Sequence, residues 1–136
     1  MSENILAIFK KAGALLDGHF LLTSGLHSPV YWEKFKVLQY PDFTRQLCEL
    51  IAENYRKKGI QVVAGPTTGG IILAFETARQ LGCRAIFAEK EGGIRVFRRD
   101  FSIHAGEKVL IVDDILTTGG SILEVINAVK LLKGNI

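Results

Sequence analysis

The segment from Val109 to Ser121 constrains the fold of this chain more than any other. It opens with four apolar residues, Val109 to Val112, three of which are β-branched. Such a run is typical of a strand that is covered on both faces. Two acidic residues, Asp113 and Asp114, follow directly, and a loop rich in threonine and glycine then leads into a helical pattern. The segment therefore predicts a strand, a polar loop and a helix in succession.

The same alternation extends over most of the chain. Strands are predicted at residues 61–64, 84–88 and 109–112, and helices at residues 42–58 and 71–81 and from Ile122 to Leu132, where apolar side chains recur at helical spacing. Strands joined by helices lie parallel with right-handed crossovers. We therefore expect a small α/β domain, doubly wound around a mostly parallel sheet, with ligands at the carboxyl ends of the strands. The first 35 residues fit a helix and two short strands that cap one edge of the sheet.

Bulk composition limits the other possibilities. A chain of 136 residues that is 48% hydrophobic suits a single domain over residues 1–136. A formal charge of +3 suits an anionic ligand but is too small to indicate nucleic acid. Cys48 and Cys83 have no metal-ligand spacing and suit reduced thiols. With no secretory signal and no apolar run of membrane-spanning length, we expect a cytoplasmic protein without a membrane partner.

The polar loop after the predicted strand carries the first candidate site. Paired carboxylates at the end of a buried strand either cap the following turn or contact a ligand, and alone they do not decide between the two. The run from Thr117 to Ser121 places glycines and hydroxyls at a helix start, where free amides and the helix dipole favour a phosphate. The chain has neither the GKS/GKT ending of a nucleotide-binding phosphate loop nor a GxGxxG pattern. The combination favours a sugar phosphate.

As a whole, VLIVDDILTTGGS resembles the signature of the type I phosphoribosyltransferases. The resemblance implies that family's fold and its donor, 5-phosphoribosyl-1-diphosphate (PRPP). It implies that the acidic pair contacts the ribose hydroxyls and that the loop holds the 5′-phosphate. The expected donor-binding residues are Asp113, Asp114, Ile115, Leu116, Thr117, Thr118, Gly119, Gly120 and Ser121.

A second glycine-rich loop follows the strand predicted at residues 61–64. Taken alone, residues 65–70 are an ordinary tight turn from a strand into a helix. In the family that this chain resembles, the corresponding loop binds the pyrophosphate of the donor. The resemblance therefore implies pyrophosphate contacts from Thr67, Thr68, Gly69 and Gly70.

Two further segments resemble the orotate phosphoribosyltransferases in particular. Residues 18–31 are similar to the piece that forms a hood over the base in those enzymes, which implies orotate contacts from Ser24 and Gly25 together with Thr117. Residues 89–105 are a charge-rich hairpin, which by itself suits a solvated surface. The resemblance implies a mobile basic lid, supplied by the neighbouring subunit of a homodimer, in which Lys90 and Arg95 are catalytic beside Asp113 and Asp114.

The chain also departs from the orotate enzymes. Many of them have lysine at the positions of Thr23 and Gly69, and in the lid only Lys90 matches clearly. Family members continue beyond Ile136 into another strand, so we expect a truncated form in which the last strand or strands are missing and a sheet edge is exposed.

The expected reaction is the transfer of the phosphoribosyl group from PRPP to orotate, which gives orotidine 5′-phosphate and pyrophosphate. The resemblance implies Mg²⁺ as cofactor, held through substrate and water without direct protein ligands. Two alternatives remain open at this point. One is a transferase for a purine or another base, and the other is a regulator that senses PRPP without catalysis.

Overall fold

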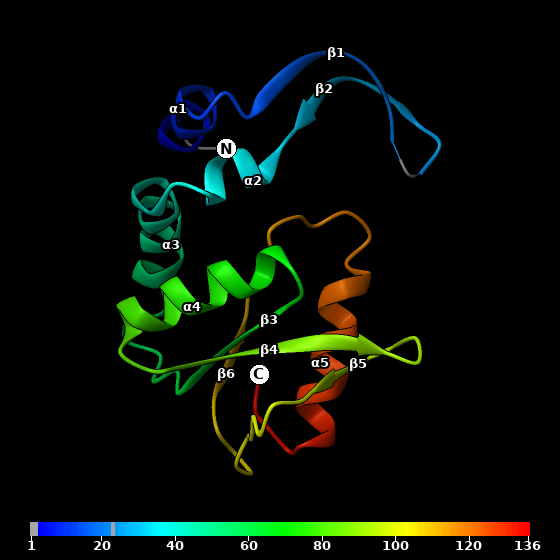
Figure 1. The fold of residues 1–136 in the computed structure, drawn as a ribbon. Helices are drawn as coiled ribbons and strands as arrows, with labels where there is room; N and C mark the ends of the chain where they lie inside the picture. The colour runs from blue at the N-terminus through cyan, green and yellow to red at the C-terminus, as the bar shows by residue number, and fades with distance from the viewer. Residues whose placement is uncertain (1–2, 23) are drawn as a thin grey trace. The chain divides into compact units, whose positions relative to one another are not determined.

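The computed structural model describes residues 3–22 and 24–136 (Figure 1). The chain forms two compact units, Met1–Thr44 and Arg45–Ile136. Within the described residues, no helix is both long enough and apolar enough to cross a membrane.

The first unit is built on a hairpin. It contains α1 (Glu3–Lys11), β1 (Leu15–Leu21), β2 (His27–Trp32) and α2 (Lys34–Leu38), and α3 (Pro41–Tyr55) begins in it. β1 and β2 pair antiparallel, with an irregularity in register between Asp17 and Phe20. The Phe9 ring of α1 packs edge-on against Trp32 of β2, with ring centroids 5.0 Å apart. The predicted helix and two short strands are therefore present, and α2 is an addition that the sequence did not indicate.

The second unit is built on a four-stranded sheet in the order β5-β4-β3-β6. Its strands are β3 (Val62–Pro66), β4 (Arg84–Glu91), β5 (Ile94–Phe97) and β6 (Val109–Ile111). β3 runs parallel to both of its neighbours, and only β5 is antiparallel to the strand beside it. The expected mostly parallel α/β fold is confirmed.

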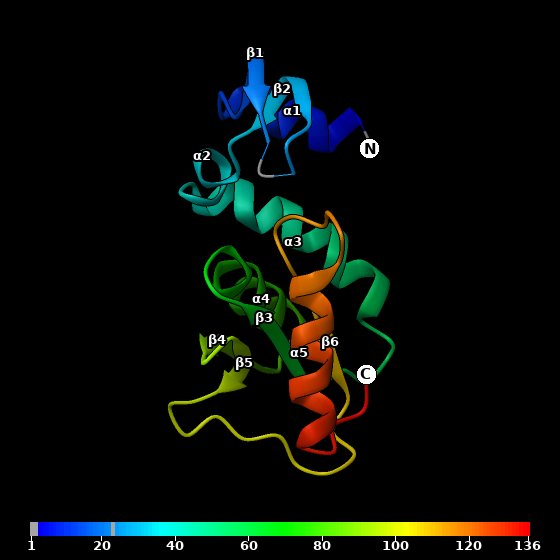
Figure 2. The ribbon, with the colours of Figure 1, turned by 90° about the vertical axis from the view of Figure 1, so that its right-hand side faces the viewer.

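Two helices enclose this sheet. α4 (Gly69–Leu81) covers one face and α5 (Gly120–Leu131) covers the other, as Figures 1 and 2 show. Because side chains alternate along a strand, Val62 and Ala64 of β3 face α5, where they share a buried cluster with Val125 and Val129. All five residues of β3 are buried, as expected for a central strand covered on both sides.

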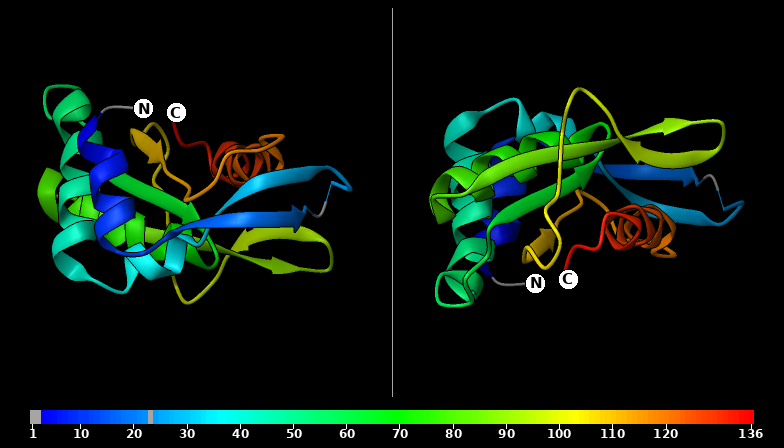
Figure 3. Two further views of the ribbon diagram at one scale, coloured as in Figure 1. Left: turned by 90° about the horizontal axis from the view of Figure 1, so that it is seen from above. Right: turned by 90° about the horizontal axis from the view of Figure 1, so that it is seen from below.

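The helix boundaries follow local signals. α4 ends at Gly82, which adopts a left-handed conformation (φ 70°) and donates its amide to the carbonyl of Ala78, as predicted for a glycine at a helix end. α3 ends at Tyr55, three residues before the predicted end. β4 continues into β5 through a turn at Gly92 and Gly93, and this hairpin projects past α5 (Figure 3).

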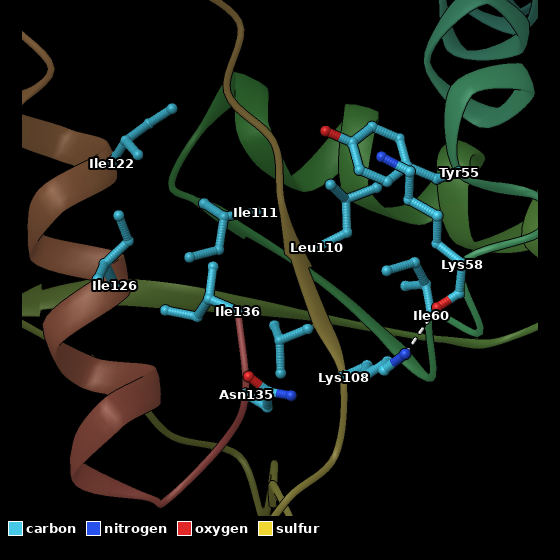
Figure 4. Close-up of a pocket in the computed structure, with 11 residues that line it drawn as sticks. Tyr55, Lys58, Ile60, Lys108, Leu110, Ile111, Ile122, Ile126, Asn135 and Ile136 are labelled. Atoms are coloured by element: carbon cyan, nitrogen blue, oxygen red, sulfur yellow. Dashed lines mark hydrogen bonds between the residues drawn. The ribbon is translucent and has the colours of Figure 1, made fainter.

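β6 forms one edge of the sheet. The amide of Val109 donates to the carbonyl of Asn135 (2.7 Å), and the amide of Asn135 donates to the carbonyl of Glu107 (2.8 Å), so the last residues of the chain lie parallel to the start of β6. Beyond them, a groove of about 450 Å³ runs along β6 between α5 and the end of α3 (Figure 4). Apolar side chains such as Ile122 and Ile126 form one wall of this groove.

Candidate functional site

Two loops leave the same edge of the sheet. β3 and β6 are parallel neighbours, with Val62 beside Val109 and Ala64 beside Ile111. The loops that follow them therefore start at the same level, at the carboxyl ends of the strands, where ligands of open α/β sheets bind. The two glycine-rich segments singled out in the sequence are these two loops.

The loops meet at Gly69 and Asp114. A Cβ atom built on Gly69 would overlap the carboxylate of Asp114, so the absence of a side chain at residue 69 makes room for this acidic group. The neighbouring carboxylate, that of Asp113, accepts a hydrogen bond from the amide of Asp114 (2.8 Å). The acidic pair is thus brought against the first residue of α4.

The loop after β6 surrounds a small hollow. Asp113 and the residues from Ile115 to Ile122 line a space of about 70 Å³. α5 starts at Gly120 behind a left-handed Gly119 (φ 82°), and no side chain caps its amino end. Its first amides therefore remain available to an anion at the positive end of the helix dipole. The structure brings together Thr117, Thr118, Gly119, Gly120 and Ser121 around this hollow, as the sequence predicted.

The loop after β3 has similar features. Its backbone is tied to β4, because the amide of Thr67 donates to the carbonyl of Ala88 (3.0 Å). The peptide bond between Thr67 and Thr68 is cis. α4 then begins at Gly69 with Thr68 as its N-cap residue and without a side-chain cap, so its first amides are also available. Gly65 allows this tight turn, because a Cβ atom there would overlap the carbonyl of Gly70.

The β4–β5 hairpin carries the predicted cations. Lys90 and Arg95 are cross-strand partners, and both pair with Glu124 of α5, at 3.6 Å from Nζ to Oε1 and 3.1 Å from Nε to Oε2. Arg95 is only 8% exposed, and its Nη1 donates to Thr67 Oγ1 (3.1 Å) and to the carbonyl of Ala88 (3.2 Å). The sequence did not single out Glu124, although a carboxylate in the middle of an apolar helix was a signal that could have found it.

Other cations of the hairpin pair with carboxylates of β4. Arg98 pairs with Glu91, and Arg99 forms two hydrogen bonds with Glu89. These bonds from Arg99 hold the pKa of the Glu89 carboxyl below its usual value. The structure has a hairpin at residues 84–97, so the basic hairpin predicted at residues 89–105 is present in its first part, whereas residues 98–105 contain no strand. The charges of Arg98 and Arg99 are balanced by nearby carboxylates.

The expected orotate contacts at Ser24 and Gly25 lie in the turn between β1 and β2, in the first unit. Gly25 has a left-handed conformation (φ 82°), and the hydroxyl of Ser24 accepts a bond from the amide of Leu26 (3.4 Å). Thr23, where many orotate enzymes have lysine, lies outside the described residues. The contribution of this turn to a base site stays a prediction.

The groups suited to holding Mg²⁺ are the carboxylates of Asp113 and Asp114. Over residues 3–22 and 24–136, no group of three or more histidine, cysteine, aspartate or glutamate side chains has the geometry to hold a metal ion. Two carboxylates beside two phosphate loops fit an ion that keeps several waters and binds phosphate oxygens, as Mg²⁺ does.

Two uncapped helix starts beside paired carboxylates suit a phosphorylated sugar as ligand. The family described as the phosphoribosyl transferase domain matches residues 36–134. The chain therefore belongs to the phosphoribosyltransferase family, and the resemblance seen at residues 109–121 is confirmed.

Within that family, several curated relatives about 50% identical to this chain are orotate phosphoribosyltransferases. The protein of that name from Desulforamulus reducens is 50% identical over 134 residues, which cover 98% of this chain and 70% of the relative. The one from Caldicellulosiruptor saccharolyticus is 52% identical with the same coverage. The crystal structure of orotate phosphoribosyltransferase from Aeropyrum pernix superposes with a TM-score of 0.77 at 28% identity, over 95% of this chain and 73% of the other. The chain thus spans about 70% of the length of these curated relatives.

Proposed function

We propose that this chain is an orotate phosphoribosyltransferase, which transfers the 5-phosphoribosyl group of PRPP to orotate and releases pyrophosphate. The observation that carries the proposal is the contact of Asp114, in the loop that leads to the uncapped start of α5, with Gly69 at the uncapped start of α4, on one edge of a parallel sheet. PRPP has a phosphate at each end and a ribose between them, and this arrangement offers two anion sites with carboxylates between them.

Each part of the donor has a proposed partner. The 5′-phosphate binds the loop from Thr117 to Ser121, with Ile115 and Leu116 forming the approach to it. The ribose hydroxyls donate to the carboxylates of Asp113 and Asp114. The pyrophosphate binds the loop from Thr67 to Gly70, where the free amides of α4 begin.

In the reaction, a ring nitrogen of orotate forms a bond to C1 of the ribose while the bond from C1 to the pyrophosphate oxygen breaks. Orotate reacts as an anion, so the protein needs no covalent intermediate, and the electron pair of the broken bond leaves with pyrophosphate. Catalysis therefore depends on aligning two anions and on stabilising the charge of the leaving group. Arg95 lies beside the pyrophosphate loop of its own subunit through its bond to Thr67, and Lys90 is proposed to supply positive charge to the leaving group from the neighbouring subunit.

Asp113 and Asp114 would hold Mg²⁺ through water, and the ion would supply positive charge beside the pyrophosphate. Ser24, Gly25 and Thr117 are proposed to contact orotate. We further propose that the protein works in the cytoplasm as a homodimer, in which the exposed end of the β4–β5 hairpin, with Lys90, closes over the site of the other subunit, while Arg95 stays bound to Thr67 of its own subunit.

The test measures the loss of orotate absorbance in the presence of PRPP and Mg²⁺. Orotate should be consumed only when both are present, and adenine, hypoxanthine and uracil should not replace it. Consumption of one of these bases instead would favour a transferase for another base. Tight PRPP binding without consumption of any base would favour a PRPP-sensing regulator.

A variant tests the site itself. Replacing both Asp113→Asn and Asp114→Asn should weaken PRPP binding by about tenfold or more, or about 1.4 kcal/mol, because ribose hydroxyls lose charged acceptors. The matched control removes two exposed carboxylates from α3, with Asp42→Asn and Glu53→Gln, and should bind PRPP normally. Unchanged PRPP affinity in the Asp113 and Asp114 variant would contradict the assignment.

A further inference from the structure

Arg95 differs from the other cations of the hairpin in its burial. Its side chain is 8% exposed, whereas those of Lys90, Arg98 and Arg99 are 57%, 52% and 62% exposed. Its guanidinium contacts three separate elements: the carboxylate of Glu124 on α5, the carbonyl of Ala88 on β4, and the hydroxyl of Thr67 in the loop after β3. Because its guanidinium is buried against these three groups, Arg95 supports the loop from inside the protein and does not reach over the loop from solvent.

These contacts fix Thr67 in two ways. The carbonyl of Ala88 accepts hydrogen bonds from the amide of Thr67 (3.0 Å) and from Nη1 of Arg95 (3.2 Å). The same oxygen therefore holds both the backbone of Thr67 and the guanidinium. The oxygen of the Thr67 hydroxyl accepts a bond from the same Nη1 (3.1 Å). Thr67 cannot rotate without breaking this bond, and Arg95 cannot leave without giving up a buried ion pair with Glu124.

The bond from Arg95 also decides what the hydroxyl of Thr67 can do. A hydroxyl has one proton to donate, and an oxygen that accepts from a guanidinium directs its own proton elsewhere. The half-buried side chain of Thr67 lies in the loop that leads into the uncapped start of α4. A cation behind the oxygen also polarises the hydroxyl, which strengthens it as a donor. Phosphate oxygens are acceptors, so a donor of this kind suits them.

We infer that Arg95 is a positioning residue, which holds Thr67 as a hydrogen-bond donor to the pyrophosphate end of the substrate and does not itself touch the substrate. This inference rests on the proposed function, because it assumes that the loop from Thr67 to Gly70 binds pyrophosphate. It adds Glu124 to the site as the residue that anchors Arg95 to α5. Lys90, which is more exposed and lies farther from Glu124, remains the cation that is able to move.

The test compares two ligands, each of which represents one end of PRPP. Pyrophosphate with Mg²⁺ probes the loop after β3, and ribose 5-phosphate probes the loop after β6, both by calorimetry on the whole chain. Arg95→Met should weaken pyrophosphate binding by about tenfold, the loss expected for about 1.4 kcal/mol, and leave ribose 5-phosphate binding unchanged. Arg95→Lys, which keeps the charge but has no second branch to reach both Thr67 and Glu124, should recover only part of the loss.

A double-mutant cycle separates positioning from direct contact. If Arg95 acts through Thr67, then Thr67→Val alone should weaken pyrophosphate binding about as much as Arg95→Met, and the double variant should be no weaker than either. In steady-state assays the single variants should raise the KM for PRPP by a similar factor. Additive losses in the double variant would mean that Arg95 contacts the substrate independently, and would overturn the inference.

Arg84, the first residue of β4, provides a control for the loss of an arginine that joins two segments away from the proposed site. It is more exposed than Arg95, at 43%, and it ties β4 to the segment between β5 and β6 by donating to the carbonyl of Ser102 (3.0 Å) and pairing with Glu107 (2.7 Å). Both Arg84→Met and Arg95→Met should lower the unfolding temperature, but Arg84→Met should not change the affinity for either ligand. Weaker binding of both ligands in Arg95→Met would indicate general disruption of the site and would also overturn the inference.

The outcome for the unmodified chain distinguishes the two proposals. If it binds no pyrophosphate in the presence of Mg²⁺, the proposed function and the inference both fail. If it binds pyrophosphate and Arg95→Met binds it equally well, only the role of Arg95 is wrong.

Discussion

Gly69 and Asp114 are in contact because residue 69 has no side chain to occupy the space of the carboxylate. Gly69→Ala would place a methyl group on that space, and the short side chain of Asp114 would have to rotate away. We expect PRPP binding to weaken by about tenfold, with a smaller change in the free energy of unfolding. Titration calorimetry and thermal unfolding measure the two effects.

The control for this variant removes the carboxylate that the new methyl group would overlap. In an Asp114→Ala background, the carboxylate is absent and Gly69→Ala should add little further loss of affinity. An equal loss from Gly69→Ala in both backgrounds would show that the methyl group acts on something other than Asp114.

For single residues, the sequence indicated which residues could form a site better than it indicated which side chains contact one another. The uncapped helix start after Thr117 was predictable because it depends only on consecutive residues. The contacts of Arg95 with Thr67 and Glu124 were not predictable. They join three elements that are distant in the chain, and their distances follow from the pairing of strands and not from local spacing.

The segment between β5 and β6 is held in place by Glu107. Its carboxylate accepts a bond from the amide of His104 (2.8 Å) and pairs with Arg84 at the start of β4 (2.7 Å). The bond from His104, and then the charge and hydrogen bond of Arg84, lower the pKa of Glu107. A carboxyl whose pKa is lower in the folded state stabilises the fold above its unfolded pKa of about 4.3, and this contribution is lost as the pH falls through the folded pKa.

Glu107→Gln should therefore lower the urea midpoint of unfolding at pH 7. The difference from the unmodified chain should shrink as the pH falls below about 4.3, because the unfolded chain then binds the proton more readily than the folded chain does. Urea titrations monitored by circular dichroism at pH 7, 5 and 3.5 measure this. A difference that stays constant with pH would mean that the charge of Glu107 contributes nothing to stability.

Element types were the best-predicted level of the structure. The strand at residues 109–112 and the helix at 71–81 were found within one or two residues at each end, because each has a strong periodic pattern and a clear boundary residue. α2 was missed, since five residues are too few to show a helical period.

The two compact units differ in the burial of their strands. β3 is buried along its whole length between two parallel neighbours, whereas β1 and β2 form a two-stranded sheet with several exposed residues in each strand. A two-stranded hairpin has little stability of its own, and central strands open only on global unfolding. We expect the amides of β3 to exchange slowest with deuterium and those of the β1–β2 hairpin to exchange among the fastest.

Hydrogen exchange with residue-level resolution tests this expectation. Slow exchange of the hairpin amides, at the rate of β3, would show that the two units unfold as one. The sequence set the first 35 residues apart from the alternating strands and helices, but it did not predict two compact units with a boundary after Thr44, because compactness depends on contacts between distant residues.

The pairing of β3 with β6 also limits how this protein can vary in length. Each residue of a strand advances it by about 3.3 Å, so one residue inserted into or deleted from either strand would move its loop by that distance relative to the other. Such a change would also turn the following side chains to the opposite face of the sheet. Gly69 would then no longer lie against Asp114, and the sites proposed for the two phosphate ends of PRPP would no longer match the span of one molecule. Insertions and deletions are therefore tolerable in the turn at Gly92 and Gly93 but not within these two strands.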